Sequence, residues 1–342
     1  MKKSKLISLI LVVAVIAVFS ISPALAKTTK WKAQSLFGAG ELTYKTFAKF
    51  CNSIKVLTGG RLEIEPLPAG TIVPTFELLE AVQNNVISAM HTGAVYYSGR
   101  EPGAAIITDL LYAYNAPWEA EAWFYYGGGK ALLNEFYNKY GITAIGVNMW
   151  GFESFPSKFP IRSMADYKGH KFRSPQGMTA DTLSKLGAGV VILPGGEVYS
   201  ALDKGVVDGA DWGTVSMNKR MGFNQIAKYF VYPEYRSMPI SDFDVNTKEW
   251  DKLPADIKAI VETAVRAWNQ DTLQRVHVED REAVIAWEAE GGEAVSWKKE
   301  DIQAMRNFVK DNVWTDWAKR SPFAGKVIDS QMKWLKRIGN IE

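Results

Sequence analysis

The 342-residue sequence predicts an α/β protein of two lobes with a cleft between them. Short apolar segments alternate with amphipathic helical segments along most of the chain, which is the pattern of βα units. The same alternation resumes after residue 150, so a second unit of similar build follows the first. One helical pattern, residues 254–289, is longer than a single domain is wide, and we expect it to brace both lobes.

Residues 1–26 have the features of a secretory signal peptide. Three lysines precede an apolar run at 6–19, and Ala24-Leu25-Ala26 supplies small side chains at the cleavage positions. We expect cleavage after Ala26, which would leave the rest of the chain in the periplasm. The alternative is an uncleaved membrane anchor, but the apolar run is short for a membrane span.

The charge and cysteine content of the remaining chain argue against two classes of protein. Without the three N-terminal lysines the 40 basic residues become 37, equal to the 37 acidic residues, and no basic cluster marks a nucleic-acid surface. Cys51 is the single cysteine, so no disulfide forms within the chain. About 316 residues are therefore stabilised by burial alone, and a chain of that size usually divides into two domains.

The first unit is predicted to contain four strands with helices between them. "TKWKAQSLF" alternates, Leu62 and Ile64 share one face of "GGRLEIEPLP", and "GITAIGVNMW" is largely apolar. Aromatic loops and helices fill residues 95–140. The predicted strands are 29–37, 59–68, 86–94 and 141–150, and the predicted helices are 42–57 and 77–84.

The second unit repeats this alternation. "KFRSP", "AGVVILP" and "VVDGADW" are predicted strands, and helices are expected at 178–186 and near Tyr199. A strand at 240–246 then precedes the long helix, whose first turn holds Pro254 and which Gly291-Gly292 ends. Residues 299–338 are helical again. We assign residues 27–150 plus 239–275 to domain I and residues 151–238 plus 276–342 to domain II.

Groups suited to catalysis are scarce. The histidines His91, His170 and His277 have no metal-binding spacing, and no nucleophile motif is present. Gly127–Gly129 lack the spacing of phosphate-binding loops and are interpreted as a helix break. We therefore expect binding without turnover, and no enzyme activity.

Arg173 is the first candidate binding residue. It lies in "KGHKFRSPQG", at the end of a strand in an α/β unit, where ligands favour the crevice outside the strand ends. A guanidinium holds a carboxylate through two parallel hydrogen bonds. From the residues alone, a carboxylate clamp and a surface ion pair are equally compatible with this position.

"DGADWG" and a group of aromatic residues are the other candidates. Asp211 and Trp212 at a strand terminus indicate a polar contact beside an apolar wall. The alternatives are that Trp212 is a core residue and that Asp211 caps a helix starting near Thr214. The aromatic group lies before the crossover between the units and comprises Tyr96, Tyr97, Trp150 and Phe152, with Asn148 and Glu153 nearby.

Together these features resemble the solute-binding subunits of TRAP transporters, the DctP-type periplasmic proteins. The resemblance covers essentially the whole chain after residue 26, and "DYKGHKFRSP" is similar to the family's "DLKGxKxRxP". "ELLEAVQNNVISAMHTGAVYYSGREPG", "ALDKGVVDGADWG" and "NTKEWDKLPADIKAIVETAV" are similar to further stretches of the family. The resemblance implies a periplasmic-binding-protein-like fold and delivery of an organic acid to TRAP membrane permease subunits.

The resemblance also implies roles for individual residues. Arg173 would bridge to the ligand carboxylate, which favours the clamp. Asp211-Trp212 is similar to the acidic–tryptophan pair of the 2-oxo-acid-binding branch, whose acidic residue helps to hold a metal cation. Tyr96 or Tyr97 falls where the family has a ligand-facing tyrosine.

Two departures from the family pattern affect the expected ligand. Glu153 stands where dicarboxylate-binding and sialic-acid-binding members often carry a second arginine, which disfavours those ligands. In the turn "PEYRSMP", Tyr235 and Ser237 replace the expected tryptophan and acidic residue. Glu153 and Asp211 therefore either coordinate a cation such as Na⁺ or Ca²⁺ that bridges to the ligand, or hold a ligand ammonium group.

We therefore expect a periplasmic monomer or dimer that closes around a small monocarboxylate, including a 2-oxo or 2-hydroxy acid. In this hypothesis Arg173 grips the carboxylate, and the walls of the site are formed by Trp212, Phe152, Asn148 and the tyrosines, Tyr235 included. A ligand-binding sensor partner of a membrane receptor uses the same chemistry. A secreted carbohydrate-active enzyme is a third alternative, because aromatic rings also stack on sugars.

Overall fold

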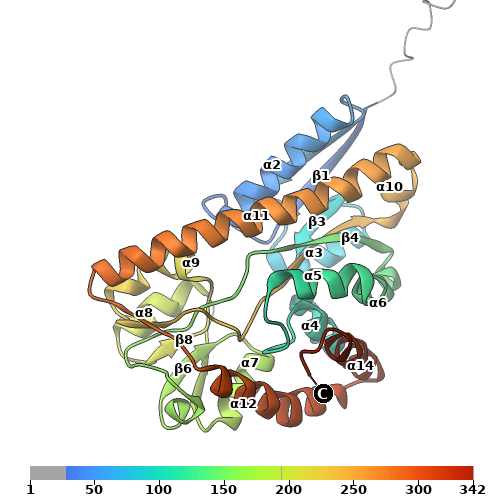
Figure 1. Cartoon of the computed structure of the whole chain (residues 1–342). Coiled ribbons are helices and arrows are strands. Elements are labelled where there is room, and N and C mark those ends of the chain that lie inside the picture. Colours follow the sequence, from blue (N-terminus) through green and yellow to red (C-terminus); the bar gives the residue numbers. More distant parts are fainter. Residues whose placement is uncertain (1–27, 194, 342) are drawn as a thin grey trace, which may run out of the picture.

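The computed structural model describes residues 28–193 and 195–341, so the predicted signal peptide lies outside the described residues. Within them, no helix combines the length and the apolar character that a membrane span needs. The chain forms two lobes, each built on its own β-sheet and surrounded by helices (Figure 1). The predicted α/β fold class is confirmed.

The first lobe is built on a five-stranded sheet of order β2-β1-β3-β10-β4. Strands β2, β1 and β3 are parallel, whereas β10 is antiparallel to both of its neighbours. Trp31 of β1 is buried and lies in register with Ile64 of β2. The strands are β1 (Thr29–Ser35), β2 (Leu62–Leu67), β3 (Ala89–Thr92), β4 (Ile142–Met149) and β10 (Ile240–Asn246).

The second lobe is built on a six-stranded sheet of order β11-β9-β5-β8-β6-β7. Three of its strands were predicted, although they are shorter than the sequence patterns. The other three have only two or three residues, too few to show a period of two. The strands are β5 (Pro156–Ser157), β6 (Lys171–Ser174), β7 (Gly189–Ile192), β8 (Gly209–Ala210), β9 (Tyr229–Val231) and β11 (Glu293–Val295).

Helices cover both sheets. The predicted helix at 42–57 is present with the same bounds, and its buried residues include Phe47 and Phe50 at helical spacing. The glycines at 127–129 separate two helices, as predicted. The helices before the long one are α2 (Leu42–Leu57), α3 (Leu78–Gln83), α4 (Pro102–Thr108), α5 (Pro117–Tyr126), α6 (Gly129–Tyr137), α7 (Met178–Lys185), α8 (Val198–Asp203), α9 (Val215–Arg220) and α10 (Thr247–Asp251).

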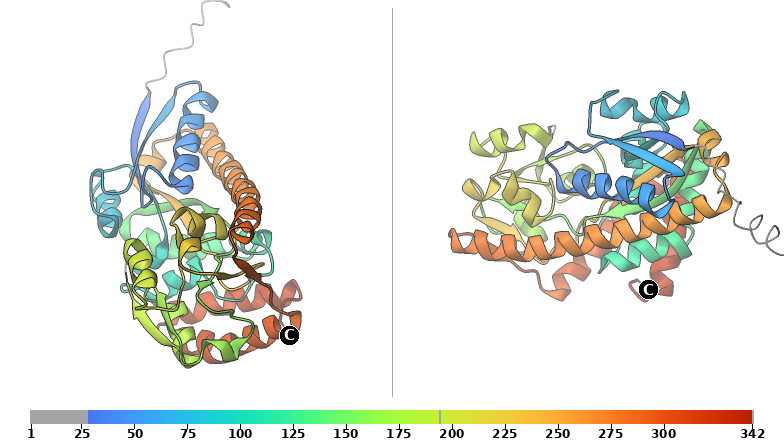
Figure 2. Two further views of the ribbon diagram at one scale, coloured as in Figure 1. Left: turned by 90° about the vertical axis from the view of Figure 1, so that its left-hand side faces the viewer. Right: turned by 90° about the horizontal axis from the view of Figure 1, so that it is seen from above.

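Helix α11 (Ala255–Ala289) runs along almost the whole length of the molecule (Figure 2). Its 35 residues correspond to about 50 Å of helix. Val261 and Trp268 belong to the core of the first lobe, beside α2 and β4, whereas Trp287 packs on Phe230 in the core of the second lobe. The expected bracing helix is therefore present.

The C-terminal helices form a base beneath both lobes (Figure 1). They are α12 (Lys299–Val309), a π-helical turn (Lys310–Trp314), α13 (Thr315–Ala318) and α14 (Pro322–Arg337). Helix α14 packs against α4 and α6 of the first lobe. The predicted domain II includes residues 276–342, but this last helix packs on the first lobe. The domain boundaries themselves remain a prediction.

Two buried carboxyl groups lie side by side on β10. Asp242 and Asp244 are two residues apart and so face the same side of the strand. Asp242 accepts a hydrogen bond from the Tyr137 hydroxyl at 2.6 Å, whereas both oxygens of Asp244 lack a hydrogen-bond partner within the described ranges. Burial raises the pKa of Asp242 to about 7. Burial, and then the charge of Asp242, raise the pKa of Asp244 well above its usual value.

The variant Asp244→Asn is expected to gain stability relative to the wild type as the pH rises from 5 to 8. A raised carboxyl pKa makes a contribution to stability that is complete below the unfolded-state pKa and is lost as the pH rises through the folded-state pKa. The unfolding free energy of the variant minus that of the wild type should grow by up to about 1.4 kcal/mol per pH unit. Urea unfolding at several pH values measures it, with the exposed Asp203→Asn as control. A difference independent of pH would contradict this assignment.

Candidate ligand-binding site

The candidate site lies where the chain crosses between the lobes. Residues 150–155 lead from β4 into β5, and residues 232–239 lead from β9 back to β10. Helix α11 passes beside both connections. The ends of β6 and β8 reach the same place, because Asp211, directly after β8, contacts the second connection.

Arg173 is held rigidly at the end of β6. The residue pairs in register with Val191 of β7 and Ala210 of β8, and only 6% of its surface is exposed. Its Nε and Nη2 atoms donate hydrogen bonds to the Leu193 carbonyl oxygen at 2.9 and 2.8 Å, and Nη1 donates to the Asp211 carbonyl oxygen. Backbone atoms following the two neighbouring strands therefore fix the orientation of the guanidinium group.

The charge of Arg173 has no internal counter-ion among the described residues. Three of its five N–H groups are used by the two carbonyls, which leaves one N–H group on each terminal nitrogen. Burial lowers the pKa of Arg173, and the more distant Asp211 and Glu153 carboxylates partly offset this effect. A buried guanidinium with two unused donors and no ion-pair partner is suited to an external carboxylate.

Asp211 has an ion-pair partner that we did not identify from the sequence. Nη2 of Arg236 donates to Oδ1 of Asp211 at 2.7 Å, and the two side chains are 3% and 4% exposed. The guanidinium carbon of Arg236 lies 5.0 Å from the centroid of the Phe155 ring. Its Nε and Nη1 atoms have no hydrogen-bond partner in the part of the chain that the structure describes.

Further carboxyl groups surround Arg236. The Ser237 hydroxyl donates to Asp109 Oδ2 at 2.5 Å and lies 3.3 Å from Glu153 Oε2. One oxygen of Glu234 accepts hydrogen bonds from the backbone N–H groups of Tyr235 and Arg236. We call Arg236 and its acidic neighbours the Arg236 cluster; the acidic members are Asp109, Glu153, Asp211 and Glu234.

Burial raises the pKa values of three acidic members of the Arg236 cluster. Burial raises the pKa of Asp109 to about 6 and that of Glu234 to about 7, although Arg236 acts to lower both values. Burial and then the Asp211 charge raise the pKa of Glu153 well above its usual range. Burial acts to lower the pKa of Arg236, but the surrounding carboxylates outweigh it and the pKa is raised. The guanidinium therefore stays charged, and the pKa values of three neighbouring carboxyl groups are raised toward or beyond neutral pH.

Trp212 forms a partly buried wall in the second lobe. Its ring packs edge-on against Phe223, with 5.9 Å between the ring centroids. A Cβ atom at Gly195 would lie 2.8 Å from Trp212 Nε1, so the absence of a side chain there permits this close approach. Thr214 occupies the N-cap position of the helix that follows, so Asp211 is not its N-cap residue.

The two adjacent tyrosines have different positions. Tyr96 is 41% exposed, and its ring packs edge-on against Phe76. Burial of the hydroxyl group and then Glu153 raise the pKa of Tyr96, whereas Arg173 lowers it, which indicates that the hydroxyl is near the site. Tyr97 is buried in the core of the first lobe and shares a hydrogen bond with Thr92 at 3.3 Å. The structure therefore places Tyr97 in the core of the first lobe, and its place at the ligand stays a prediction.

Asn148 lies near the end of β4, just before the first connection. It lies fully buried on β4, where Nδ2 donates to the Thr272 hydroxyl of α11 at 3.0 Å. This contact fixes the bracing helix to the first sheet. Oδ1 of Asn148 has no hydrogen-bond partner among the described residues, and a role of this side chain at the ligand stays a prediction.

Phe152 and Tyr235 line a separate cavity of about 420 Å³. Their ring centroids are 5.9 Å apart. The cavity lies between the two connections and α11, and its other walls include Glu234 and His277. Arg173 does not line it, so the structure does not bring these two aromatic residues to the guanidinium group.

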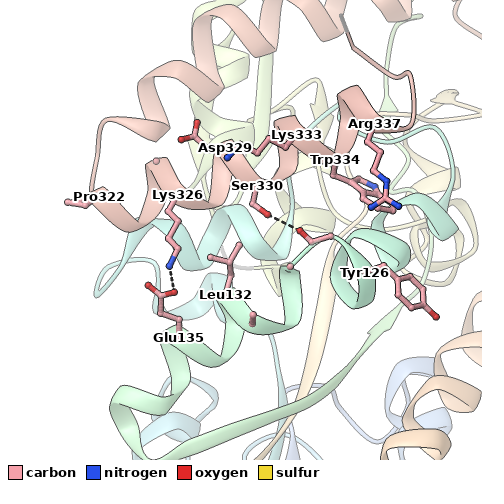
Figure 3. A pocket seen from close by; sticks show the side chains of 14 residues that line it. Tyr126, Leu132, Glu135, Pro322, Lys326, Asp329, Ser330, Lys333, Trp334 and Arg337 are labelled. Carbon is pink, nitrogen blue, oxygen red and sulfur yellow. Dashed lines mark hydrogen bonds and ion pairs between the residues drawn. The ribbon is translucent and has the colours of Figure 1, made fainter.

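A larger cavity of about 780 Å³ lies between α14 and the α5–α6 connection (Figure 3). It contains no predicted site residue. Some of its polar groups bind one another: Lys326 pairs with Glu135 at 2.5 Å, and Ser330 donates to the Gly127 carbonyl oxygen at 3.1 Å. We therefore do not place ligand binding there, although it is the larger of the two cavities.

The Arg236 cluster does not fit a metal ion. Calcium requires six to eight oxygen ligands, but an Asp211 oxygen is already paired with a guanidinium group. Within residues 28–193 and 195–341, no group of three or more His, Cys, Asp or Glu side chains is arranged to hold a metal ion. The structure therefore gives no support to the predicted cation held by Asp211 and Glu153.

Arg236, Asp109 and Glu234 were missed because no local pattern identifies them. Arg236 and Glu234 belong to the turn "PEYRSMP", whose charged residues look like those of a solvated loop. Asp109 offered one signal, because it is a single acidic residue inside the apolar stretch "AAIITDLLYAY".

Comparisons with known proteins agree with the fold and the resemblance. The model of the bacterial extracellular solute-binding protein family 7, DctP, matches residues 33–320. A monocarboxylate 2-oxoacid-binding periplasmic protein from Nostoc sp. is 33% identical over 291 residues, covering 83% of this chain and 76% of that protein.

Two solved structures are similar over most of the chain. A TRAP periplasmic solute-binding protein from Rhodobacter sphaeroides, in an apo open form, is 36% identical with a TM-score of 0.82, covering 91% of this chain and 99% of that one. A TRAP periplasmic solute-binding protein from Pseudoalteromonas atlantica, with bound sodium and pyruvate, is 25% identical with a TM-score of 0.77, covering 92% and 96%.

Proposed function

Because the chain belongs to the DctP family of bacterial extracellular solute-binding proteins, we propose that it captures a small monocarboxylate, such as a 2-oxo or 2-hydroxy acid, in the periplasm. It then delivers this acid to TRAP membrane permease subunits. The family consists of binding proteins, which agrees with the scarcity of catalytic groups and disfavours a carbohydrate-active enzyme. A sensor partner of a receptor would use the same site.

One observation carries this proposal: the environment of Arg173. The guanidinium is buried and oriented by two backbone carbonyls, and it has two unused N–H groups without an internal carboxylate partner. A ligand carboxylate would supply both the missing charge and two hydrogen-bond acceptors. Tyr96 and Trp212 would bound the ligand from the first and second lobes, so hinge closure would bury it between them.

Glu153 and Asp211 restrict the size and charge of the ligand. Both lie close enough to influence the pKa of Arg173, so a second carboxylate beyond the first would meet negative charge. We therefore propose a ligand with a single carboxylate.

A screen of organic acids by thermal shift and titration calorimetry tests this function. Pyruvate and other small 2-oxo acids should raise the melting temperature, whereas a C4-dicarboxylate and the methyl ester of pyruvate should not. The ester is the matched control, because it keeps the 2-oxo group and removes the carboxylate charge. Failure of every monocarboxylate to bind would contradict the proposal.

Binding of the acid is expected to tighten as the pH falls from 8 to 6. A bound carboxylate adds a negative charge near Glu153, whose pKa is already raised, so it favours the protonated form of Glu153. Each proton taken up on binding strengthens affinity by up to tenfold per pH unit. Calorimetry in buffers of different ionisation enthalpy measures proton uptake, and Glu153→Gln should reduce it. If the affinity for the acid did not change between pH 8 and pH 6, this prediction would be contradicted.

A further inference from the structure

We infer that Arg236 is the built-in cation of this site, so that the chain binds its carboxylate ligand without sodium or calcium. This inference rests on the proposed function, and it concerns what neutralises the acidic groups beside the ligand. The sodium reported with the Pseudoalteromonas atlantica protein shows that a similar fold can hold a metal ion together with pyruvate. The residues of the present chain point to a different arrangement.

The first argument is the position of the Arg236 guanidinium. It lies 2.7 Å from Asp211 Oδ1, and Nη2 also approaches the Glu153 carbonyl oxygen at 3.4 Å. Asp211 and Glu153 are the side chains for which the sequence suggested a metal ion. A second cation at Asp211 would have to displace the guanidinium or share the carboxylate with it at short range, where two positive charges repel.

The second argument is the burial of Arg236. Its side chain is 3% exposed, is covered on one side by the Phe155 ring, and retains two nitrogens without a hydrogen-bond partner within the described residues. Placing an arginine charge in such a position is costly unless nearby carboxylates compensate for it. The buried carboxyl groups and the guanidinium therefore depend on each other, as carboxylates and a metal ion do in a metal site.

The third argument is the permanence of this charge. A guanidinium is not deprotonated in proteins, so the cation is present at any physiological pH. A bound metal ion, in contrast, is lost when its concentration falls. A site with a covalently attached cation would bind its acid independently of the sodium or calcium content of the medium.

The test compares pyruvate binding with and without metal ions. Protein treated with EDTA and exchanged into sodium-free buffer is titrated with pyruvate, and the titration is repeated after addition of millimolar calcium or of sodium. The dissociation constants are expected to agree within twofold. A tenfold or larger gain of affinity with either ion would overturn the inference.

A second measurement does not depend on the ligand, and it separates this inference from the proposed function. Equilibrium dialysis of the protein against calcium without any acid should show no stoichiometric binding, and calcium should not shift the melting temperature. Stoichiometric calcium binding would overturn the inference even if no acid in the screen binds. Absence of acid binding with no calcium binding would contradict the proposed function and leave the metal-free cluster supported.

Two variants at one position complete the test. Arg236→Gln removes the charge and should make the melting temperature increase with calcium, because Asp211 and Glu153 lose their cation. Arg236→Lys keeps the charge and should remain insensitive to calcium. A glutamine variant that calcium leaves unchanged would contradict the inference; if that variant does not fold, the calcium measurements on the wild type and on the lysine variant decide.

Discussion

The variant Arg173→Ala is expected to raise the dissociation constant of every carboxylate ligand by a factor of about 30 to 5,000, equivalent to about 2–5 kcal/mol. The reason is that the ligand carboxylate would enter a buried position without its counter-ion. The Leu193 and Asp211 carbonyl oxygens would also lose their donor. Titration calorimetry with pyruvate, or with any acid that the screen identifies, measures this loss.

Two further variants make this measurement specific. Arg173→Lys keeps the charge but loses the planar fork, so it should bind more weakly than the wild type and more tightly than the alanine variant. The exposed Arg162, which pairs with Glu293 at the surface, is the matched control, and Arg162→Ala should bind normally. Unchanged affinity of Arg173→Ala for each bound acid would exclude the clamp.

The variant Arg236→Met is expected to lower the free energy of unfolding by about 3–5 kcal/mol, because it leaves buried carboxylates without compensation. Asp211 loses its partner, and the pKa values of Glu153 and Glu234 rise further because Arg236 acts to lower both. Urea unfolding at neutral pH measures the loss. The loss should be smaller at acidic pH, where the carboxyl groups bind protons.

A double-mutant cycle separates the ion pair from simple packing. Asp211→Asn in the Arg236→Met background should restore part of the stability, because it removes the buried charge that the methionine leaves behind. Arg162→Met breaks an exposed pair instead and should cost less than about 1 kcal/mol. If Arg236→Met were as stable as the wild type, the Arg236 cluster would not be the charge-balanced unit described above.

The sequence predicted the long and strongly periodic elements well. The helix at 42–57, the strand at 240–246 and the long helix all have the expected bounds to within a residue, because each buries one face over many residues. Strands β5, β9 and β11 were not predicted, since they are short and their partners are distant in sequence. Such strands are defined by the hydrogen bonds between their backbones, and they are too short for an alternation of side chains to show them in the sequence.

The candidate site was predicted only in part, for a related physical reason. Arg173 and Asp211 follow strands with clear patterns, so their place at the strand ends could be expected. Arg236 lies in a connection whose path depends on how both lobes pack, and its burial is not visible in neighbouring residues. The resemblance leaves open which of Tyr96 and Tyr97 faces the ligand, and the tight turn directs the two rings to different surroundings.

The order of strands in the first sheet has a consequence for biosynthesis. Strand β4 has a single neighbour in its sheet, β10. The 90 residues that separate the two strands along the chain include most of the second sheet. The N-terminal half of the chain therefore cannot complete its sheet while the ribosome is still making the middle of the protein. A truncated product ending before residue 240 would expose the edges of both β3 and β4, which are surfaces prone to aggregation.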